Sequence, residues 1–293
     1  MSSTARSAVK AIPIAQAART PRRRRFELLL TRLGLIVLCI VVLLPAYWVL
    51  VASFQVGSSA FSSGLWPTSF TWDNYSSIFD QGFWTWIRNS FVICTVTGVV
   101  QLIVNTLGAF AFSRLRFRGR RFGLVALLLL QMFPQMLGLS AIFILLVYLN
   151  LLDTYQGIIL IYIGGSAFNI WLLKNYMDTV PKEMDESAYV DGANAWQIFW
   201  LLVLPLLRPM LVTVFIYGFT GTYNDFIFSS IILQSRDHYT VSVGLFHLID
   251  GNYATNWAVF AAGAVLSSIP ILVVYLSLQK QLVAGLASGA VKG

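Results

Sequence analysis

The chain has 293 residues, 57% of them hydrophobic and 11% charged, with a formal net charge of +8. Because soluble globular domains carry about 25% charged residues, this composition excludes an ordinary soluble protein and indicates one that crosses a membrane several times. Its two cysteines and two histidines provide neither a disulfide framework nor a metal-binding cluster.

A basic arm, residues 1–33, opens the chain and contains the run Arg22 to Arg25. Such a run can bind nucleic acid, but here it lies directly before an apolar stretch, where it fixes the orientation of a membrane helix. We therefore expect no nucleic-acid partner. The long arm, the apolar stretch of about twenty residues and the lack of a small-x-small cleavage site also distinguish this region from a cleaved signal peptide.

Six stretches are apolar enough to cross a hydrocarbon layer, which takes roughly 17–25 residues per helix. Because every backbone donor and acceptor inside lipid needs a partner, each is predicted to be helical. The predicted fold is an all-α, polytopic membrane protein with one six-span transmembrane domain over 34–278 and a tail over 279–293. The predicted spans are 34–54, 90–112, 122–149, 157–173, 210–233 and 257–278.

The basic residues predict how these spans are oriented. Of the 20 Lys and Arg residues, 18 lie on one side, and only Arg88 and Arg236 lie on the other. Since cytoplasmic loops carry the excess of basic residues, both termini and the loop at about 178–208 are predicted to be cytoplasmic. The protein is then a multi-pass protein of the cytoplasmic (plasma or inner) membrane.

The first outer loop, about 55–88, is rich in aromatic residues, as in GLWPTSFTWDNY and GFWTWIRNS. Amphipathic rings prefer the membrane interface, so one interpretation is a short interfacial helix. The other is a docking surface for an external partner.

Within the spans, uncharged polar residues outnumber ionisable ones. Asp225 is the one ionisable group well inside a predicted span, which argues against an ion-driven symporter, because such proteins need buried relay groups. Uncharged polar side chains can line a wet path for a hydroxylated solute or bond to neighbouring helices. Pro134 and Pro270 are expected to interrupt spans three and six. The candidate pore-lining residues are Gln101, Asn105, Gln131, Asn169, Thr220 and Asn224.

The cytoplasmic loop contains ESAYVDGANAWQIFWLLVLPLLRP, residues 186–209. Pro181 suits a helix start, and the acids that follow it favour the positive end of a helix. Gly192 can adopt the left-handed conformation that ends helices, and Asn194 with Gln197 predicts a capping box for a second, apolar helix. Such a rigid corner could dock onto another protein or simply rest on the bilayer.

The same segment resembles the E-A-A-x-x-x-G motif, followed nine residues later by I-x-L-P, of permease subunits of ABC importers. Ser187 and Leu202 depart from the motif but conserve size or apolarity. The resemblance implies that this helix couples to a separate ATPase. The implied coupling residues are Glu186, Ser187, Ala188, Asp191, Gly192, Leu204 and Pro205.

Further stretches resemble the sugar-importing branch of that family, of the maltose and maltodextrin type, from about residue 34 to the end. They include RNSFVICTVTG, NIWLLKNYMDTVPKEMDESAYVDGAN, TYNDFIFSSIIL and the ending QKQLVAGLASGAVKG. The first outer loop is shorter than in some relatives. The resemblance gives the tail a docking or regulatory role between two ATPase subunits. The residues concerned are Ser288, Gly289, Ala290, Val291, Lys292 and Gly293.

The resemblance implies a permease subunit of an ATP-driven importer of maltose, maltodextrin or related oligosaccharides. Its implied partners are a second permease, an ATPase homodimer, an extracytoplasmic sugar-binding protein and the lipid bilayer. Because the chain has no G-x-x-x-x-G-K-S/T loop, we expect a non-catalytic subunit without cofactors, with ATP and Mg bound by the ATPase. The alternatives are a self-contained secondary transporter or channel for small polar solutes, and a membrane-embedded enzyme.

Overall fold

The computed structural model describes residues 21–57, 69–164, 166–250 and 256–290 of the chain. These residues form helices, turns and loops without a β-strand, which confirms the predicted all-α fold. Contacts group the chain into two units, Met1–Trp48 and Val49–Gly293. By length and composition, three helices can cross a membrane, or up to six if each of three bent helix pairs is one span.

Helix α1, Pro21–Ser53, supplies the first predicted span and contains Pro45 without a break. Its apolar stretch, Glu27–Ser53, is long enough to cross a bilayer, and most of its described side chains are exposed in the chain alone. Only its last turn, from Val51, is buried. A helix that is apolar all round needs lipid or another protein around it.

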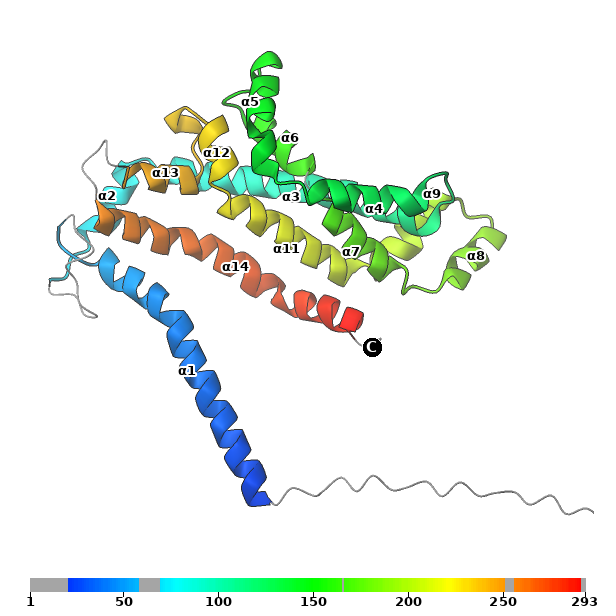
Figure 1. Ribbon diagram of the computed structural model, residues 1–293, viewed down its shortest axis with the longest axis horizontal. Coiled ribbons are helices and arrows are strands. Elements are labelled where there is room, and N and C mark those ends of the chain that lie inside the picture. Colours follow the sequence, from blue (N-terminus) through cyan, green and yellow to red (C-terminus); the bar gives the residue numbers. More distant parts are fainter. Residues whose placement is uncertain (1–20, 58–68, 165, 251–255, 291–293) are drawn as a thin grey trace, which may run out of the picture. The chain divides into compact units, whose positions relative to one another are not determined.

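Three long helices form the centre of the unit that begins at Val49. Helix α11, Arg208–Asn224, packs against both α3, Phe83–Arg114, and α14, Trp257–Ala290 (Figure 1). The approach of α3 to α11 is close at Gly218, where an added Cβ would collide with Gln101 and lie 3.7 Å from the Gly98 Cα. Small residues permit such packing between membrane helices.

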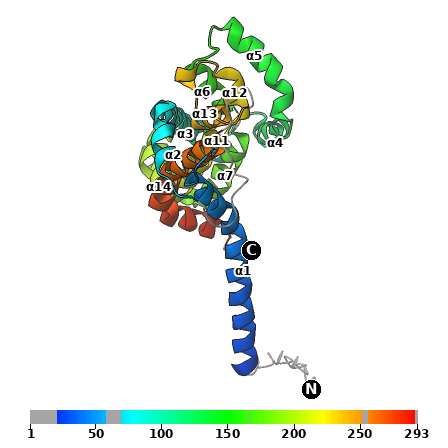
Figure 2. The same ribbon diagram turned by 90° about the vertical axis from the view of Figure 1, so that its left-hand side faces the viewer.

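The third predicted span is broken, as expected at Pro134, whereas the expectation for Pro270 is corrected. Pro134 lies in a full break, because α4, Arg120–Gln131, and the following Gln135–Tyr148 meet at 81°. The expected interruption at Pro270 is wrong, since α14 runs through it. Figure 2 shows α5, Leu139–Tyr148, projecting away from the other helices.

Spans four and five are also bent. Helices α6, Tyr155–Gly164, and α7, Ala167–Met177, meet at 51°. The predicted span 210–233 is not one helix, because α11 ends at Asn224 and Asp225 is extended. The chain instead pairs α11 with the preceding stretch Ala195–Leu206 at 80°.

Short elements complete the second unit. In the first outer loop, α2 follows an aromatic cluster in which the Phe54 and Phe70 rings stack at 4.6 Å. Helix α2 confirms the prediction of a short helix in this loop. The short elements are α2, Asp73–Asp80; η2, Gln135–Gly138; α8, Lys182–Val190; α9, Ala195–Gln197; η3, a π-helix at Ile198–Val203; α10, Leu204–Leu206; α12, Ile227–Ile232; η4, Arg236–His238; and α13, Val241–His247.

Candidate functional site

Helix α8 ends in a Schellman motif, and Gly192 has the left-handed conformation that the sequence predicted. Gly192 has φ +87°, a conformation in which glycine pays no Cβ penalty. The Ala193 N–H donates to the Ala188 carbonyl at 2.9 Å, and the Gly192 N–H donates to the Tyr189 carbonyl at 3.1 Å. These two bonds satisfy carbonyls that a helix end leaves unpaired, so the turn after α8 has a fixed direction.

The predicted capping box is confirmed. The Asn194 side chain accepts from the Gln197 N–H at 2.9 Å, and the Gln197 side chain accepts from the Asn194 N–H at 2.8 Å. The apolar stretch that this box begins passes through the π-helical turn of η3 and meets α11 at 80°. Hydrogen-bonded motifs therefore lie on both sides of the turn after α8: the Schellman motif ends α8, and the capping box begins the apolar stretch that leads to α11. We call residues 191–207, which join α8 to α11, the corner.

The C-terminal end of α3 anchors α8 and the residues before it. Arg114 Nε lies 2.7 Å from Asp185 Oδ2, and the two side chains are 6% and 10% exposed. The Arg114 Nη2 donates to the Val180 carbonyl at 3.0 Å, and the Ser113 hydroxyl donates to Asp178 Oδ1 at 2.5 Å. Residues before and within α8 are therefore held by consecutive residues of a predicted membrane-spanning helix.

The two anchoring carboxyls have opposite pKa shifts. Burial raises the pKa of Asp185, although the Arg114 and Lys182 charges oppose the rise. For Asp178, partial burial also favours a higher pKa, but hydrogen bonds from Lys174 and Ser113 outweigh it and lower the pKa. Asp178 therefore stays ionised at neutral pH.

The residues that the motif assigned to coupling lie on the outer surface of α8 and the corner. Glu186, Ser187, Asp191 and Gly192 are exposed, and Ala188 is half-buried. The same helix exposes apolar side chains, above all Val190, which is 88% exposed.

Beneath the exposed surface lies a packed apolar core. Phe199 is 2% exposed and meets the Phe110 ring of α3 edge-on at 5.0 Å. Leu204 and Ala188 pack against this core, while Pro205 is exposed in α10. Because close-packed interiors deform little, this core fixes α8 against α3 and α11. The buried residues of this core are Ala109, Phe110, Leu173, Met177, Ile198, Phe199, Val203, Leu207, Met210 and Val214.

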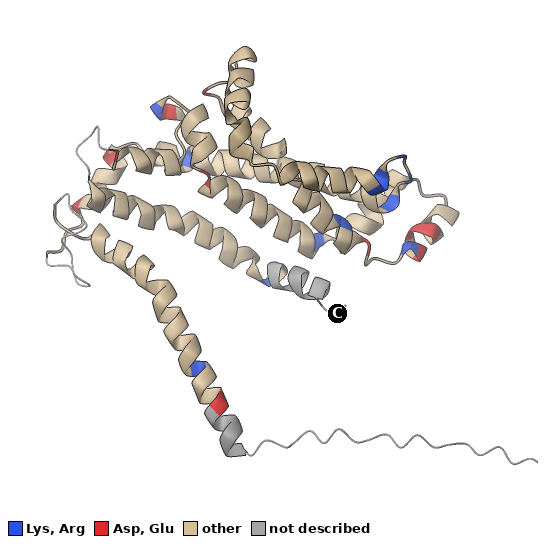
Figure 3. Cartoon of the chain, viewed as in Figure 1, with Lys and Arg blue, Asp and Glu red and all other residues tan. Residues whose placement is uncertain are grey.

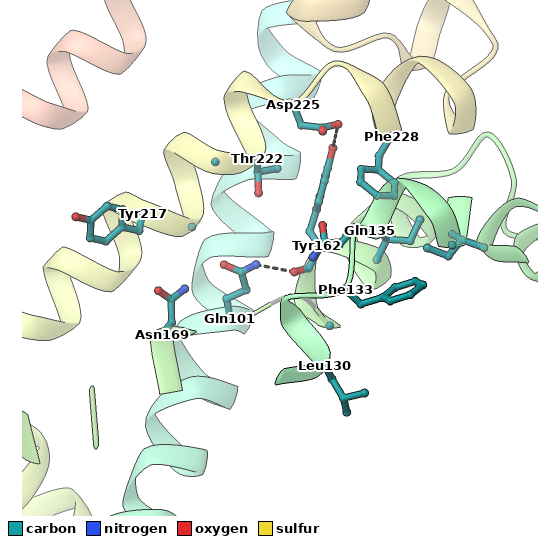
Figure 4. Close-up of a pocket in the computed structure, with 16 residues that line it drawn as sticks. Gln101, Leu130, Phe133, Gln135, Tyr162, Asn169, Tyr217, Thr222, Asp225 and Phe228 are labelled. Carbon is teal, nitrogen blue, oxygen red and sulfur yellow. Dashed lines mark hydrogen bonds between the residues drawn. The ribbon is translucent and has the colours of Figure 1, made fainter. Parts of the chain in front are cut away.

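A second candidate site is a cavity of about 520 Å³ between α3, α4, α6, α7 and α11 (Figure 4). Its polar lining includes Tyr217 and Thr222 of α11 and Gln135 of η2, and Phe133 and Phe228 supply aromatic surface. Polar and apolar groups contribute to the lining in similar measure, so the cavity can exchange hydrogen bonds with a polar small molecule.

A hydrogen-bonded chain supports one wall of the cavity. The Tyr162 hydroxyl donates to Asp225 Oδ1 at 2.7 Å and contacts the Ser229 hydroxyl at 3.0 Å. The Ser229 N–H donates to the same carboxylate oxygen at 3.1 Å, and Gln101 donates to the Tyr162 carbonyl at 2.6 Å. Asp225, at the break between α11 and α12, is thereby fixed by neighbours on two elements.

The structure brings only part of the predicted pore-lining set to this cavity, namely Gln101 and Asn169. Asn105 is buried and accepts from Ser166 at 2.7 Å, and Gln131 accepts from the Phe168 N–H at 2.7 Å. Thr220 bonds back to the Ile216 carbonyl, and Asn224 is exposed at the end of α11.

Sequence reasoning missed Tyr162 and Tyr217 as lining residues. An isolated tyrosine in an apolar span carries little signal, and only the folded contacts bring Tyr162 to Asp225. The structure describes only part of the predicted docking tail. The backbone of α14 reaches Ser288, Gly289 and Ala290, whereas Val291, Lys292 and Gly293 lie outside the described residues.

Comparison with known proteins links this architecture to a family. Residues 104–288 match the family model described as "Binding-protein-dependent transport system inner membrane component". The chain is 41% identical to the galactooligosaccharides transport system permease protein of Bacillus subtilis, over 92% of this chain and 98% of that protein. It is 38% identical to the maltodextrin transport system permease protein of Streptococcus pneumoniae, with the same coverage.

A solved structure shares the fold. A chain of a bacterial ABC transporter involved in the import of the acidic polysaccharide alginate superposes with a TM-score of 0.75 and 28% identity. The match covers 89% of this chain and 98% of that one.

Proposed function

The chain belongs to the family of binding-protein-dependent transport system inner membrane components, and on this premise we propose that it is the permease subunit of an ATP-driven oligosaccharide importer. The relatives are permease proteins named for maltodextrin and galactooligosaccharides, so a short neutral oligosaccharide is the proposed cargo. A second permease, two ATPase subunits and an external sugar-binding protein complete the proposed assembly.

The observation that carries this proposal is the anchoring of α8 by Arg114 and Asp185. A helix that receives work from another protein must pass on its displacement without bending. The buried ion pair, the Schellman motif and the capping box hold α8 to α3 and to the corner that leads to α11. We infer that α8, on the cytoplasmic side, docks on an ATPase and moves these helices as a rigid group.

The cavity supplies the proposed path for the sugar. Amide, hydroxyl and carboxylate groups from Gln101, Asn169, Thr222 and Asp225 can exchange hydrogen bonds with sugar hydroxyls, while Phe133 offers an apolar face. Motion of α11 changes this cavity directly, since the same helix continues from the corner below. The proposed route of coupling is therefore α8, the corner, α11 and the cavity wall.

Site-directed crosslinking tests the docking of α8. A cysteine at Val190 in a Cys39→Ser background should crosslink to an ATPase subunit in the purified assembly, because Val190 is exposed and the remaining Cys94 is buried. The matched control is a cysteine at Asp237, which is exposed on η4. If a scan along α8 gives no more crosslinking than Asp237→Cys, the docking proposal is wrong.

Reconstitution tests the energy source. The complete assembly in liposomes should take up maltodextrin or galactooligosaccharide only with ATP, and the permease chain alone should not. Ion-driven accumulation of sugar by the chain alone would instead establish a self-contained secondary transporter. Comparing saccharides as activators of ATP hydrolysis identifies the cargo.

A further inference from the structure

A second hollow, of about 670 Å³, lies against α4 and α7 and the turn that joins α3 to α4. Its volume is within the range of roughly 300–1,000 Å³ typical of small-molecule sites. Its long wall is apolar and includes Leu124, Val125, Leu128 and Trp171. Val125 and Trp171 are 53% and 37% exposed, so this wall faces the surroundings of the chain. We call this hollow the α4–α7 groove.

The polar end of the α4–α7 groove is basic. Arg120, Arg121 and Lys174 line it, and none of its lining residues is acidic. In Figure 3, Lys and Arg residues gather toward the right-hand end of the helices that begin after Val49. Lys174 is partly neutralised by Asp178, 2.6 Å away, so the two arginines dominate the charge of this end.

The two arginines are held differently. Arg120 donates to the carbonyls of Phe112, Ser113 and Leu115 at 2.6, 2.9 and 3.3 Å, which fixes its guanidinium at the end of α3 and leaves two N–H groups free to donate. Carbonyls carry no net charge, so they leave the full positive charge of the guanidinium. Arg121 is exposed and has no hydrogen-bond or ion-pair partner among the residues that the structure describes. One fixed and one free arginine can therefore share an anion.

We propose that the α4–α7 groove binds an anionic phospholipid of the cytoplasmic leaflet. The acyl chain lies along Leu124, Val125 and Leu128, and the phosphate accepts hydrogen bonds from Arg121 and the remaining donor capacity of Arg120. Basic hollows between membrane helices on the cytoplasmic side suit such headgroups. The inference rests on the cytoplasmic orientation of this end, but not on which solute is carried.

The arrangement of charge and apolar surface selects this ligand. A free phosphate would contact only the basic end and leave the apolar wall uncovered. A helix of another protein could cover the wall, but it would need an acidic residue at the level of Arg121. A single phospholipid can cover the apolar wall with its acyl chain and contact the basic end with its phosphate. Phospholipid is also the molecule that surrounds a membrane protein.

Native mass spectrometry of the purified assembly tests the proposal, with phosphatidylglycerol and phosphatidylcholine of identical acyl chains as probes. Wild-type protein should retain phosphatidylglycerol in preference. Loss of one basic residue near a membrane surface costs about 1 kcal/mol, so Arg121→Gln should weaken that retention about fivefold. Arg118→Gln is the matched control, because Arg118 is exposed in the same turn but does not line the groove.

Filling the apolar wall gives an independent measurement. Val125→Trp should reduce retention of both lipids equally, since it occupies the space of the acyl chain, whereas Arg121→Gln should reduce retention of phosphatidylglycerol more than that of phosphatidylcholine, whose choline charge offsets its phosphate. Equal retention of the two lipids by wild type, or equal losses from Arg118→Gln and Arg121→Gln, would overturn the proposal. So would a photocrosslinker at Val125 that labels a permease helix instead of lipid. None of these outcomes bears on sugar uptake, so the proposed transport function is tested separately.

Discussion

Arg114, the last residue of α3, and Asp185, in the first turns of α8, form an ion pair of 2.7 Å between Nε and Oδ2. Arg114 Nη1 and Asp185 Oδ1 are buried without a hydrogen-bond partner among the described residues. The pair is thus a single close contact inside the protein rather than part of a fully satisfied network. Such a contact positions two helices strictly, and it is costly to break from one side only.

Replacing Asp185 with Ala should leave the Arg114 guanidinium buried and unpaired, which costs about 3–5 kcal/mol. Thermal unfolding in detergent measures the loss. Glu183→Ala is the control, because Glu183 is an exposed acid of the same helix. A double variant, Arg114→Met with Asp185→Leu, should be more stable than Asp185→Ala. Equal melting temperatures of the Asp185→Ala and Glu183→Ala proteins would contradict a structural role of the pair.

Replacing Gly192 with Val should uncouple ATP hydrolysis from uptake or prevent assembly. A Cβ at this position meets nothing within 4 Å, but φ is +87°, so the cost is backbone strain of about 1–2 kcal/mol and a reoriented corner. Asn, which tolerates this conformation better, should preserve more activity. Gly34→Val, also in open space but in the regular helix α1, serves as control. Normal coupling in Gly192→Val would exclude a requirement for the Schellman turn.

Replacing Asn194 with Ala should remove the capping box and destabilise the start of the apolar stretch by about 1 kcal/mol. Hydrogen exchange of the Gln197 amide, whose N–H donates to Asn194, should accelerate. Asn194→Ser should retain most of the protection, because serine is also a good N-cap. Unchanged exchange in Asn194→Ala would show that packing alone holds this turn.

Replacing Tyr162 with Phe removes the hydroxyl that donates to Asp225 and contacts Ser229. Hydrogen bonds to charged groups contribute about 1.5–3 kcal/mol, so stability should fall by that order, and sugar-stimulated ATP hydrolysis should weaken as Asp225 loses its position. Tyr217→Phe is the matched control, since Tyr217 lines the same cavity without a hydrogen bond among the described residues. Equal losses in both variants would contradict a specific role of the Tyr162–Asp225 contact.

Replacing Asp153 with Asn tests a pH dependence. Partial burial favours a higher pKa of Asp153, but hydrogen bonds from Ser235 and Gln234 outweigh it and lower the pKa. A lowered folded-state pKa contributes stability that is present above the unfolded value of about 3.9 and is lost as pH falls through the folded value. The stability gap between wild type and Asp153→Asn should therefore persist from pH 7 to 5, where Asp153 also keeps its contact with His238 Nδ1 at 3.2 Å, and close only below about pH 3.9. A gap that closes near pH 6 would contradict this assignment.

The local elements of the loop segment could be predicted because their signals are short-range. Gly192 and the pair Asn194 and Gln197 act within one helix turn, and the structure shows both motifs. The family resemblance, carried by residues 186–205, is confirmed by relatives that match over most of the chain. Membrane location followed from composition, and the family description agrees with it.

Long-range features could not be predicted in the same way. Hydropathy gives the number of apolar residues in a row, but it does not distinguish a straight helix from two helices that meet at 80°. The same limit explains Pro134 and Pro270, since one proline breaks a span and the other is accommodated within a continuous helix. The Arg114–Asp185 and Tyr162–Asp225 contacts join distant segments, so a single sequence carries no local signal for them.

The length of helix α14 bears on how far its C-terminal turns extend past the bilayer. Its 34 residues, at a rise of 1.5 Å each, form a rod about 51 Å long, whereas the hydrocarbon layer is about 30 Å thick. If Trp257 marks one surface of that layer and the rod stands upright, about 20 Å of it extends past the opposite surface. In that arrangement the last turns of this helix reach the water beyond the hydrocarbon layer, where a water-soluble neighbour can contact them.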